Sequence, residues 1–213
     1  MDKYVKNDGC GIFVQLGAGV GDLDPRSQFR DGFTEFVKSL SKETIKKIIL
    51  VEPNPLNIIK LKECWKDYPQ AEIYELAITP NDTNENISNF YYCPDDGPHY
   101  HIASINQSHI HNSRYGHNCN LIKISVKTQN INSFLEEKVG NNIELLGMDI
   151  EGLDIPVLLN INFDKFKIKY LSFEHLCLKE KKDLIFNHLN NNNLHYLGYG
   201  LDHNGYDYLF VNK

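Results

Sequence analysis

The feature that most constrains this chain is a glycine-rich turn that comes directly after a short apolar run. Residues 12–16 read Ile-Phe-Val-Gln-Leu, and Gly17-Ala18-Gly19-Val20-Gly21 follows at once. Glycine adopts positive φ without steric cost and lets a ligand lie against main-chain atoms. Apolar residues then recur at helical spacing over residues 26–40. The order strand, glycine turn and helix predicts a buried strand that ends at a ligand-binding loop.

Strands and helices alternate along the remaining chain. Strands are predicted at 48–51, 72–78, 122–126, 143–150 and 168–173, with a short extended piece at 89–93. Helices are predicted at 54–65, 130–139 and 179–191. Asn54 is a good N-cap for the first of them, and Pro55 suits its first helical position. Alternation of this kind predicts a parallel sheet with helices on both faces and a ligand site at the carboxyl ends of the strands.

The C-terminal end of the chain departs from this alternation. Two predicted strands, 194–200 and 206–211, are joined by a short turn that contains Asn204-Gly205. Strands joined by such a turn are antiparallel. We therefore predict an α/β, Rossmann-like fold with a mostly parallel sheet and a C-terminal antiparallel hairpin.

Length and composition favour one domain. With 213 residues and 41% hydrophobic content, residues 1–213 are long enough for one sizeable core and short for two. The segment 94–120 has no clear period, and we expect it to form an excursion over the ligand end of the sheet. Loops of this length are usually functional or mobile.

Charge and cysteine content bear on partners and location. The formal net charge of −6 argues against a surface that binds nucleic acid. No apolar run approaches the roughly 20 residues that span a bilayer, and the first residues lack the pattern of a secretory signal. We therefore expect a cytoplasmic protein without a membrane partner. The 5 cysteines are odd in number and scattered, which favours reduced thiols.

An acidic residue accompanies the glycine turn. Glu52 ends the second predicted strand, where a carboxylate can accept hydrogen bonds from both ribose hydroxyls of an adenosine. The dinucleotide fingerprint GxGxxG does not fit, because Asp22 stands at its third glycine. The pattern GxGxG followed by an acid suits an adenosine ligand without a pyrophosphate. A purely structural glycine turn is the alternative.

Four segments together resemble the FkbM family of methyltransferases. They are 13–22 (FVQLGAGVGD), 51–55 (VEPNP), 125–135 (SVKTQNINSFL) and 146–154 (LGMDIEGLD), the last similar to the family's DxEG signature. The resemblance covers about 13–174. It implies a class I methyltransferase fold that binds S-adenosylmethionine and transfers a methyl group to a hydroxyl, often on a saccharide or natural product.

The resemblance and the glycine turn together define an expected cofactor site. Gln15 stands where many methyltransferases carry an acid that holds the methionine ammonium, so this role is expected of Asp22 or Asp149. The full expected set is Gly17, Ala18, Gly19, Gly21, Asp22, Glu52, Pro53, Ala77 and Asp149.

Candidate catalytic residues lie at the ends of the strands predicted at 143–150 and 168–173. Asp149 and Glu151 lie at the end of the first of these, and alternation would point both side chains the same way. Glu174 and His175 follow the second, beside them. His175 suits a general base, because an unperturbed histidine has a pKa of about 6.5. The alternative is that Glu174 or His175 caps a helix or satisfies buried backbone groups.

The segment 94–120 carries five of the nine histidines. They are His99, His101, His109, His111 and His117, and each HxH pair could place two imidazoles on one face of a strand. This pattern would suit a metal site, but no cysteine or acid recurs at tight ligand spacing apart from Asp95-Asp96. Contacts to a sugar from Tyr100, His101 and Tyr115 are the expectation, and no metal ligand is predicted.

These observations favour an O-methyltransferase that acts on a hydroxyl of a small-molecule or saccharide acceptor. A methyltransferase that acts on protein or nucleic acid is a second hypothesis, although Asp149-Ile150-Glu151-Gly152 differs from the (D/N)PP(Y/F) motif of adenine-directed DNA enzymes. A catalytically silent module that keeps the fold is a third. The sequence does not determine the oligomeric state, and a homo-oligomer is compatible with it.

Overall fold

A seven-stranded sheet forms the centre of the protein. The computed structural model describes residues 10–22, 30–80, 86–94, 102–113, 119–176 and 178–213. The strand order is β3-β2-β1-β7-β8-β10-β9. The strands are β1 (Gly11–Leu16), β2 (Ile45–Val51), β3 (Ala71–Tyr74), β7 (Asn142–Met148), β8 (Lys167–Glu174), β9 (Leu194–Tyr199) and β10 (Asp207–Asn212). The first five pair in parallel, whereas β10 is antiparallel to β8 and β9, which confirms the predicted fold class.

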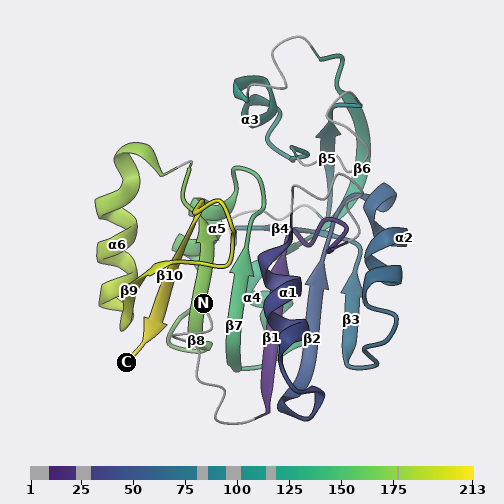
Figure 1. Ribbon diagram of the computed structural model, residues 1–213. Coiled ribbons are helices and arrows are strands. Elements are labelled where there is room, and N and C mark those ends of the chain that lie inside the picture. Colours follow the sequence, from purple (N-terminus) through teal and green to yellow (C-terminus); the bar gives the residue numbers. More distant parts are fainter. Residues whose placement is uncertain (1–9, 23–29, 81–85, 95–101, 114–118, 177) are drawn as a thin grey trace.

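Helices cover both faces of this sheet (Figure 1). They are α1 (Gly32–Ser39), α2 (Pro55–Cys64), α4 (Ile131–Phe134), α5 (Asp154–Asn160) and α6 (Lys182–Asn191). A π turn, Leu135–Val139, continues α4, and 3₁₀ turns at Lys42–Thr44 and Lys179–Lys181 precede β2 and α6. No helix in the described ranges is long and apolar enough to cross a membrane.

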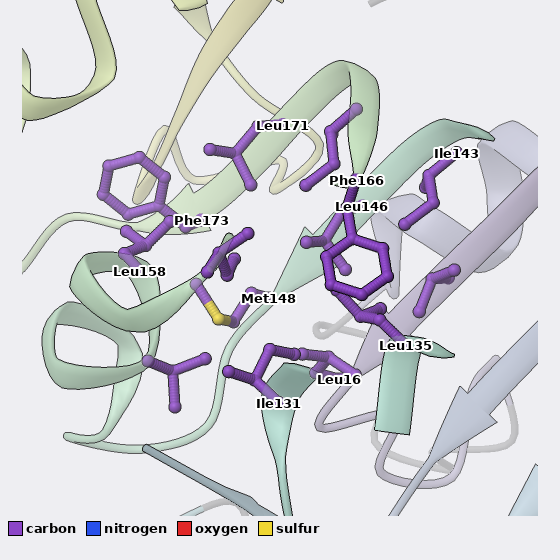
Figure 2. Packing of buried hydrophobic residues seen from close by; sticks show 14 of the residues in the cluster. Leu16, Ile131, Leu135, Ile143, Leu146, Met148, Leu158, Phe166, Leu171 and Phe173 are labelled. Atoms are coloured by element: carbon purple, nitrogen blue, oxygen red, sulfur yellow. The ribbon is translucent and has the colours of Figure 1, made fainter. Parts of the chain in front are cut away.

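Successive side chains of the central strands enter two separate cores. Phe13 packs with Phe33 of α1 and Leu61 of α2 on one face. Its neighbour Val14 packs with α4, α5 and α6 on the other face, in the cluster that contains Phe134. Figure 2 shows ten labelled members of this second core. Because both faces are covered, the strands are apolar at nearly every position, which is why the sequence shows apolar runs rather than alternation.

A second, three-stranded sheet lies above the carboxyl ends of the central strands (Figure 1). Its order is β4-β6-β5, with β4 (Ala77–Thr79), β5 (Ile87–Tyr92) and β6 (Ile122–Asn130). The short helix α3 (Gln107–Asn112) packs beside it. The prediction of a single strand over residues 72–78 is therefore wrong. Residues 71–74 pair with β2, whereas 77–79 pair with β6, so the chain leaves one sheet for the other.

A disulfide joins the two ends of the segment between β5 and β6. Cys93 and Cys119 are bonded, and their Cα atoms lie 6.0 Å apart. The prediction of reduced thiols is wrong for this pair, because antiparallel pairing places Tyr92 opposite Ile122 and brings the flanking cysteines together. Cys10 and Cys64 are free, and Cys177 lies outside the described residues.

Capping side chains set the beginnings of α1 and α2. The predicted N-cap Asn54 accepts a hydrogen bond from the Leu56 backbone N–H, and Pro55 opens α2 as expected. Helix α1 begins at Gly32, after Asp31 as N-cap, and not at residue 26; residues 23–29 lie outside the described chain. Asp31 thus stands at a helix N-terminus that faces the carboxyl end of β1.

Candidate active site

A cavity of about 260 Å³ opens at the carboxyl ends of the central strands. Its wall is formed by the turns after β1, β2 and β7, by the β9–β10 hairpin and by the small sheet. Most of the predicted cofactor and catalytic residues line it: Gly17, Ala18, Gly19, Gly21, Glu52, Pro53, Ala77, Asp149 and Glu151. Asp22, Glu174 and His175 are described but do not line it, and Tyr100, His101 and Tyr115 lie outside the described residues.

The glycine turn after β1 is held by backbone hydrogen bonds and leaves room for a ligand. The N–H groups of Gly17 and Ala18 both donate to the Val51 carbonyl, at 2.9 Å each. Gly19 has a φ of +54°, and a Cβ built there would meet no atom within 4 Å. The space beside Gly19 is therefore cavity, where a ligand can contact the main chain.

Glu52 connects this turn to the start of α2. Its Oε2 accepts from the Gly19 N–H at 2.8 Å, and its Oε1 accepts from the Asn54 N–H at 2.8 Å and from the Asn57 side chain at 3.4 Å. Burial raises the pKa of Glu52 to about 7, although these donors oppose the rise. A carboxylate has about four acceptor positions, so room remains for ligand hydroxyls.

An acid that the sequence analysis did not select lies beside Gln15. Asp31 accepts hydrogen bonds from the Gln15 side chain at 2.9 Å and from the Thr34 N–H at 3.0 Å, and the Thr34 hydroxyl donates to it as well. Gln15 and Asp31 both line the cavity. Burial raises the pKa of Asp31. An acid three residues before Thr34 at the start of a helix is an N-cap signal that could have identified it.

Asp22 faces away from the cavity. Its carboxylate lies 3.3 Å from Lys38 Nζ, and its N–H donates to the Cys64 sulfur at 3.4 Å. A role of Asp22 in cofactor binding stays a prediction, whereas Asp149 and Asp31, which bonds Gln15, both line the cavity.

The loop after β7 brings Asp149 and Glu151 to the cavity, although not by strand alternation. Strand β7 ends at Met148, and Glu151 has a φ of +50°, so both acids stand on a turn. The Glu151 carboxylate lies 2.7 Å from His109 Nε2, and its carbonyl accepts from the Ser104 hydroxyl at 2.7 Å. The His109 ring packs against Gly152, where a Cβ would lie 2.7 Å from Nδ1. The glycine of the DxEG segment therefore makes room for a histidine of the excursion.

Acidic residues gather behind Asp149. Burial and the neighbouring carboxylates raise the pKa of Asp154 to about 7 and that of Glu174 to about 10. Burial, with the charge of Asp149, also raises the pKa of Asp207 to about 7, and Ser172 donates to Asp207 at 2.9 Å. Burial also raises the pKa of Asp149 to about 6, although a hydrogen bond from the Glu151 N–H opposes the rise. This side of the cavity is strongly acidic.

His175 is engaged by the C-terminal hairpin. Its Nε2 lies 3.0 Å from the Gly205 carbonyl oxygen, and its ring stacks on Tyr208 with centroids 3.9 Å apart. These contacts match the structural alternative considered for this residue, and its role as a general base stays a prediction.

The pair His109 and His111 lies on α3, not on a strand. Residues two apart on a helix point to different sides, so the expected common face is wrong for this pair. His109 contacts Glu151, whereas His111 Nε2 lies 3.3 Å from the Gln107 side chain. His99, His101 and His117 lie outside the described residues.

The sheet order, the cavity at its carboxyl edge and the glycine turn with Glu52 define a class I methyltransferase. The family model described as Methyltransferase FkbM domain matches residues 15–208, and the chain belongs to this family. S-adenosylmethionine is the cofactor of such enzymes. No curated protein matches the chain.

Several solved structures of methyltransferases are similar to this chain at low sequence identity. The FkbM methyltransferase of Methylobacillus flagellatus KT is 13% identical, with a TM-score of 0.51 over 96% of this chain and 44% of its own. The fibrillarin of Aeropyrum pernix with bound S-adenosyl-L-methionine is 10% identical, with a TM-score of 0.46 over 96% and 66%. The TrmK of M. capricolum with S-adenosyl-homocysteine is 11% identical, with a TM-score of 0.47 over 99% and 65%. This chain thus spans less than half of the Methylobacillus protein.

Proposed function

We propose that this methyltransferase transfers the methyl group of S-adenosylmethionine to a hydroxyl of a saccharide or a small natural product. The observation that carries the proposal is the charge of the cavity wall. Among the described residues its acids are Asp31, Glu52, Asp149, Glu151, Asp202 and Asp207, and its one basic residue is Arg30. Arg30 pairs with Glu35, outside the wall. Such a cavity disfavours a polyanion such as RNA and suits a neutral, hydroxyl-rich acceptor.

The residues of the cavity suit the cofactor. The open space beside Gly19 and the buried carboxylate of Glu52 can hold an adenosine, with Glu52 accepting from its ribose hydroxyls. Asp31 and Asp149 can hold the methionine ammonium. Bound S-adenosylmethionine supplies a methyl group on a positively charged sulfur. The acids near that group also stabilise the positively charged sulfur of the cofactor more than the neutral sulfur that remains after transfer.

In this proposal, Glu151 removes the proton of the acceptor hydroxyl. Its carboxylate lines the cavity, and the His109 ring fixes it from behind at 2.7 Å. A hydroxyl is a weak nucleophile at neutral pH, so a positioned carboxylate can take its proton as the new bond to carbon forms. Alignment of the acceptor oxygen and exclusion of water are the other contributions of the protein.

The segment between β5 and β6 is proposed as the acceptor side of a single-domain enzyme. Ala103, Ser104 and Ile105 line the cavity, and Ser104 bonds the Glu151 carbonyl. The Cys93–Cys119 disulfide holds both ends of the segment. Disulfides are rare in a reducing cytosol, so this bond argues against the cytoplasmic location expected from the sequence. Alkylation of thiols in freshly lysed cells tests that point.

The first experiment is a calorimetric titration of S-adenosylmethionine and, separately, of NAD into the full chain. Micromolar binding of S-adenosylmethionine alone supports the proposal, and binding of NAD alone contradicts it. Methyl transfer from labelled cofactor is then measured with a panel of sugars and small alcohols, with a protein and an RNA pool as comparisons. Transfer only to RNA or protein would overturn the acceptor class. Cofactor binding without transfer to any acceptor would favour a silent module.

A further inference from the structure

Three carboxylates from separate segments converge behind the cavity. Asp149 follows β7, Asp154 begins α5, and Glu174 ends β8. One oxygen of each lies within 4.8 Å of an oxygen of the other two. Parallel pairing of β7 with β8 places the ends of these two strands side by side, and the turn of 149–152 returns the chain so that Asp154 faces them.

Two of these carboxylates carry buried oxygens without a hydrogen-bond donor. The Asp154 side chain belongs to a residue that is 2% exposed, and its Oδ1 accepts from the Ile150 N–H at 3.1 Å. Its Oδ2 is buried and has no partner among the described residues, and the same holds for Glu174 Oε2. Leaving such an oxygen unsatisfied costs about 1–3 kcal/mol, more if it is charged. A single ligand bound between these carboxylates would therefore satisfy both oxygens.

No basic side chain of the described residues forms an ion pair with any of the three. We propose that a hard divalent cation binds between Asp149, Asp154 and Glu174. Two ligands of one ion can stand apart by up to about twice the bond length, which is about 5 Å for Ca²⁺ and about 4.2 Å for Mg²⁺ or a similar small ion. The limit of 4.8 Å is an upper bound on the three spacings, so the three oxygens can close on Ca²⁺ with a small movement and on Mg²⁺ with a larger one.

The position of the cluster gives such an ion access to the acceptor side. Asp149 lines the cavity and Asp154 and Glu174 do not, so an ion held by all three would lie at the cavity wall. A catalytic use of the ion rests on the proposed function: it would bind the acceptor oxygen and ease loss of its proton to Glu151. The binding itself does not depend on that function.

The test is cation binding to the metal-stripped full chain. Mn²⁺ binding is followed by electron paramagnetic resonance, and Ca²⁺ and Mg²⁺ by competition and by the shift in Tm. We expect one site, and at least a tenfold loss of affinity in Asp154→Asn and in Glu174→Gln. Asn keeps an oxygen that can accept from the Ile150 N–H, so Asp154→Asn preserves that bond. Asp183→Asn, on the exposed side of α6, is the matched control and should bind as the native chain does.

Two outcomes would overturn the site. One is a folded native chain that binds none of the three ions at millimolar concentration, which would mean that protons alone neutralise the cluster. The other is binding that Asp154→Asn and Glu174→Gln leave unchanged. Titration of S-adenosylmethionine into the same samples keeps the two proposals separate. Cofactor and cation binding without O-methylation would remove the proposed function and leave the cation site standing.

Discussion

Glu52 and Glu174 are both carboxylates at the carboxyl ends of parallel strands, yet their surroundings differ. Both oxygens of Glu52 accept hydrogen bonds, from Gly19 on one side and from α2 residues on the other. Glu174 has a buried oxygen without a donor and acidic neighbours instead. The surroundings of Glu52 are thus organised by the protein itself, whereas those of Glu174 hold excess negative charge that a proton or a cation must balance.

This difference indicates which side of the site depends on a ligand for its stability. A group whose acceptors are satisfied by the fold keeps its geometry in the free protein. A cluster of like charges is stable only when something neutralises it. The predictions below test the contrast between the Glu52 side and the Glu174 side.

Replacing Glu52 by Ala should have the largest effect, because it removes the ribose acceptor and the tether of the glycine turn together. We expect S-adenosylmethionine to bind at least about 100-fold more weakly, from the loss of charge-assisted hydrogen bonds of about 1.5–3 kcal/mol each. Calorimetry measures the change, and Glu63→Ala at an exposed position of α2 is the control. Unchanged affinity would show that Glu52 supports only the turn.

Replacing Glu151 by Gln should slow methyl transfer without weakening cofactor binding. We expect kcat to fall by about 100-fold, the usual loss for a general base, while the Kd of S-adenosylmethionine stays within about twofold. His175→Gln is the comparison, because its ring contacts the hairpin rather than the cavity. If His175→Gln lowers kcat more than Glu151→Gln does, and shifts the pH profile, the base is His175.

The acidic cluster should make the protein less stable at high pH when no cation is present. The pKa of Glu174 is raised from its ordinary value to about 10, so the folded state holds a proton that the unfolded state has lost. Stability from this group is therefore full below about pH 4.5 and decreases as the pH rises toward 10.

Thermal unfolding from pH 6 to pH 9 checks that sign. Glu174→Gln should reduce the pH dependence, by an amount on the order of 1 kcal/mol per pH unit. Added Ca²⁺ should restore stability at pH 9 in the native chain and not in the variant. A native chain that gains stability between pH 6 and pH 9 without cations would contradict the assignment.

Replacing Gly19 by Ala should have the smallest effect of the set. The positive φ costs a non-glycine residue about 1–2 kcal/mol, and the methyl group of Ala would occupy part of the cavity. We expect roughly tenfold weaker cofactor binding with little change in cation binding, measured by the two titrations. Equal losses in both titrations would mean that the two sides of the cavity are not independent.

The cofactor half of the site could be predicted from the sequence because its signals are local. An apolar run, three glycines and an acid after the next run occupy short segments, and the Asn54-Pro55 pair marks the start of α2. The position of Glu52 beside Gly19 follows from parallel pairing of adjacent strands. Asp31 was missed because its cap follows residues 23–29, where helical spacing of apolar residues led the predicted helix to begin too early.

What the sequence by itself determined is the order of most strands and helices, the glycine turn after the first strand and the acids at the strand ends, since each depends on residues a few positions apart. The tertiary structure alone decided the division of 72–78 between two sheets, the Cys93–Cys119 bond and the meeting of Asp154 with Glu174. These features depend on which distant segments pack together. That choice is made by burial of apolar surface over the whole chain, and no short stretch of sequence contains it.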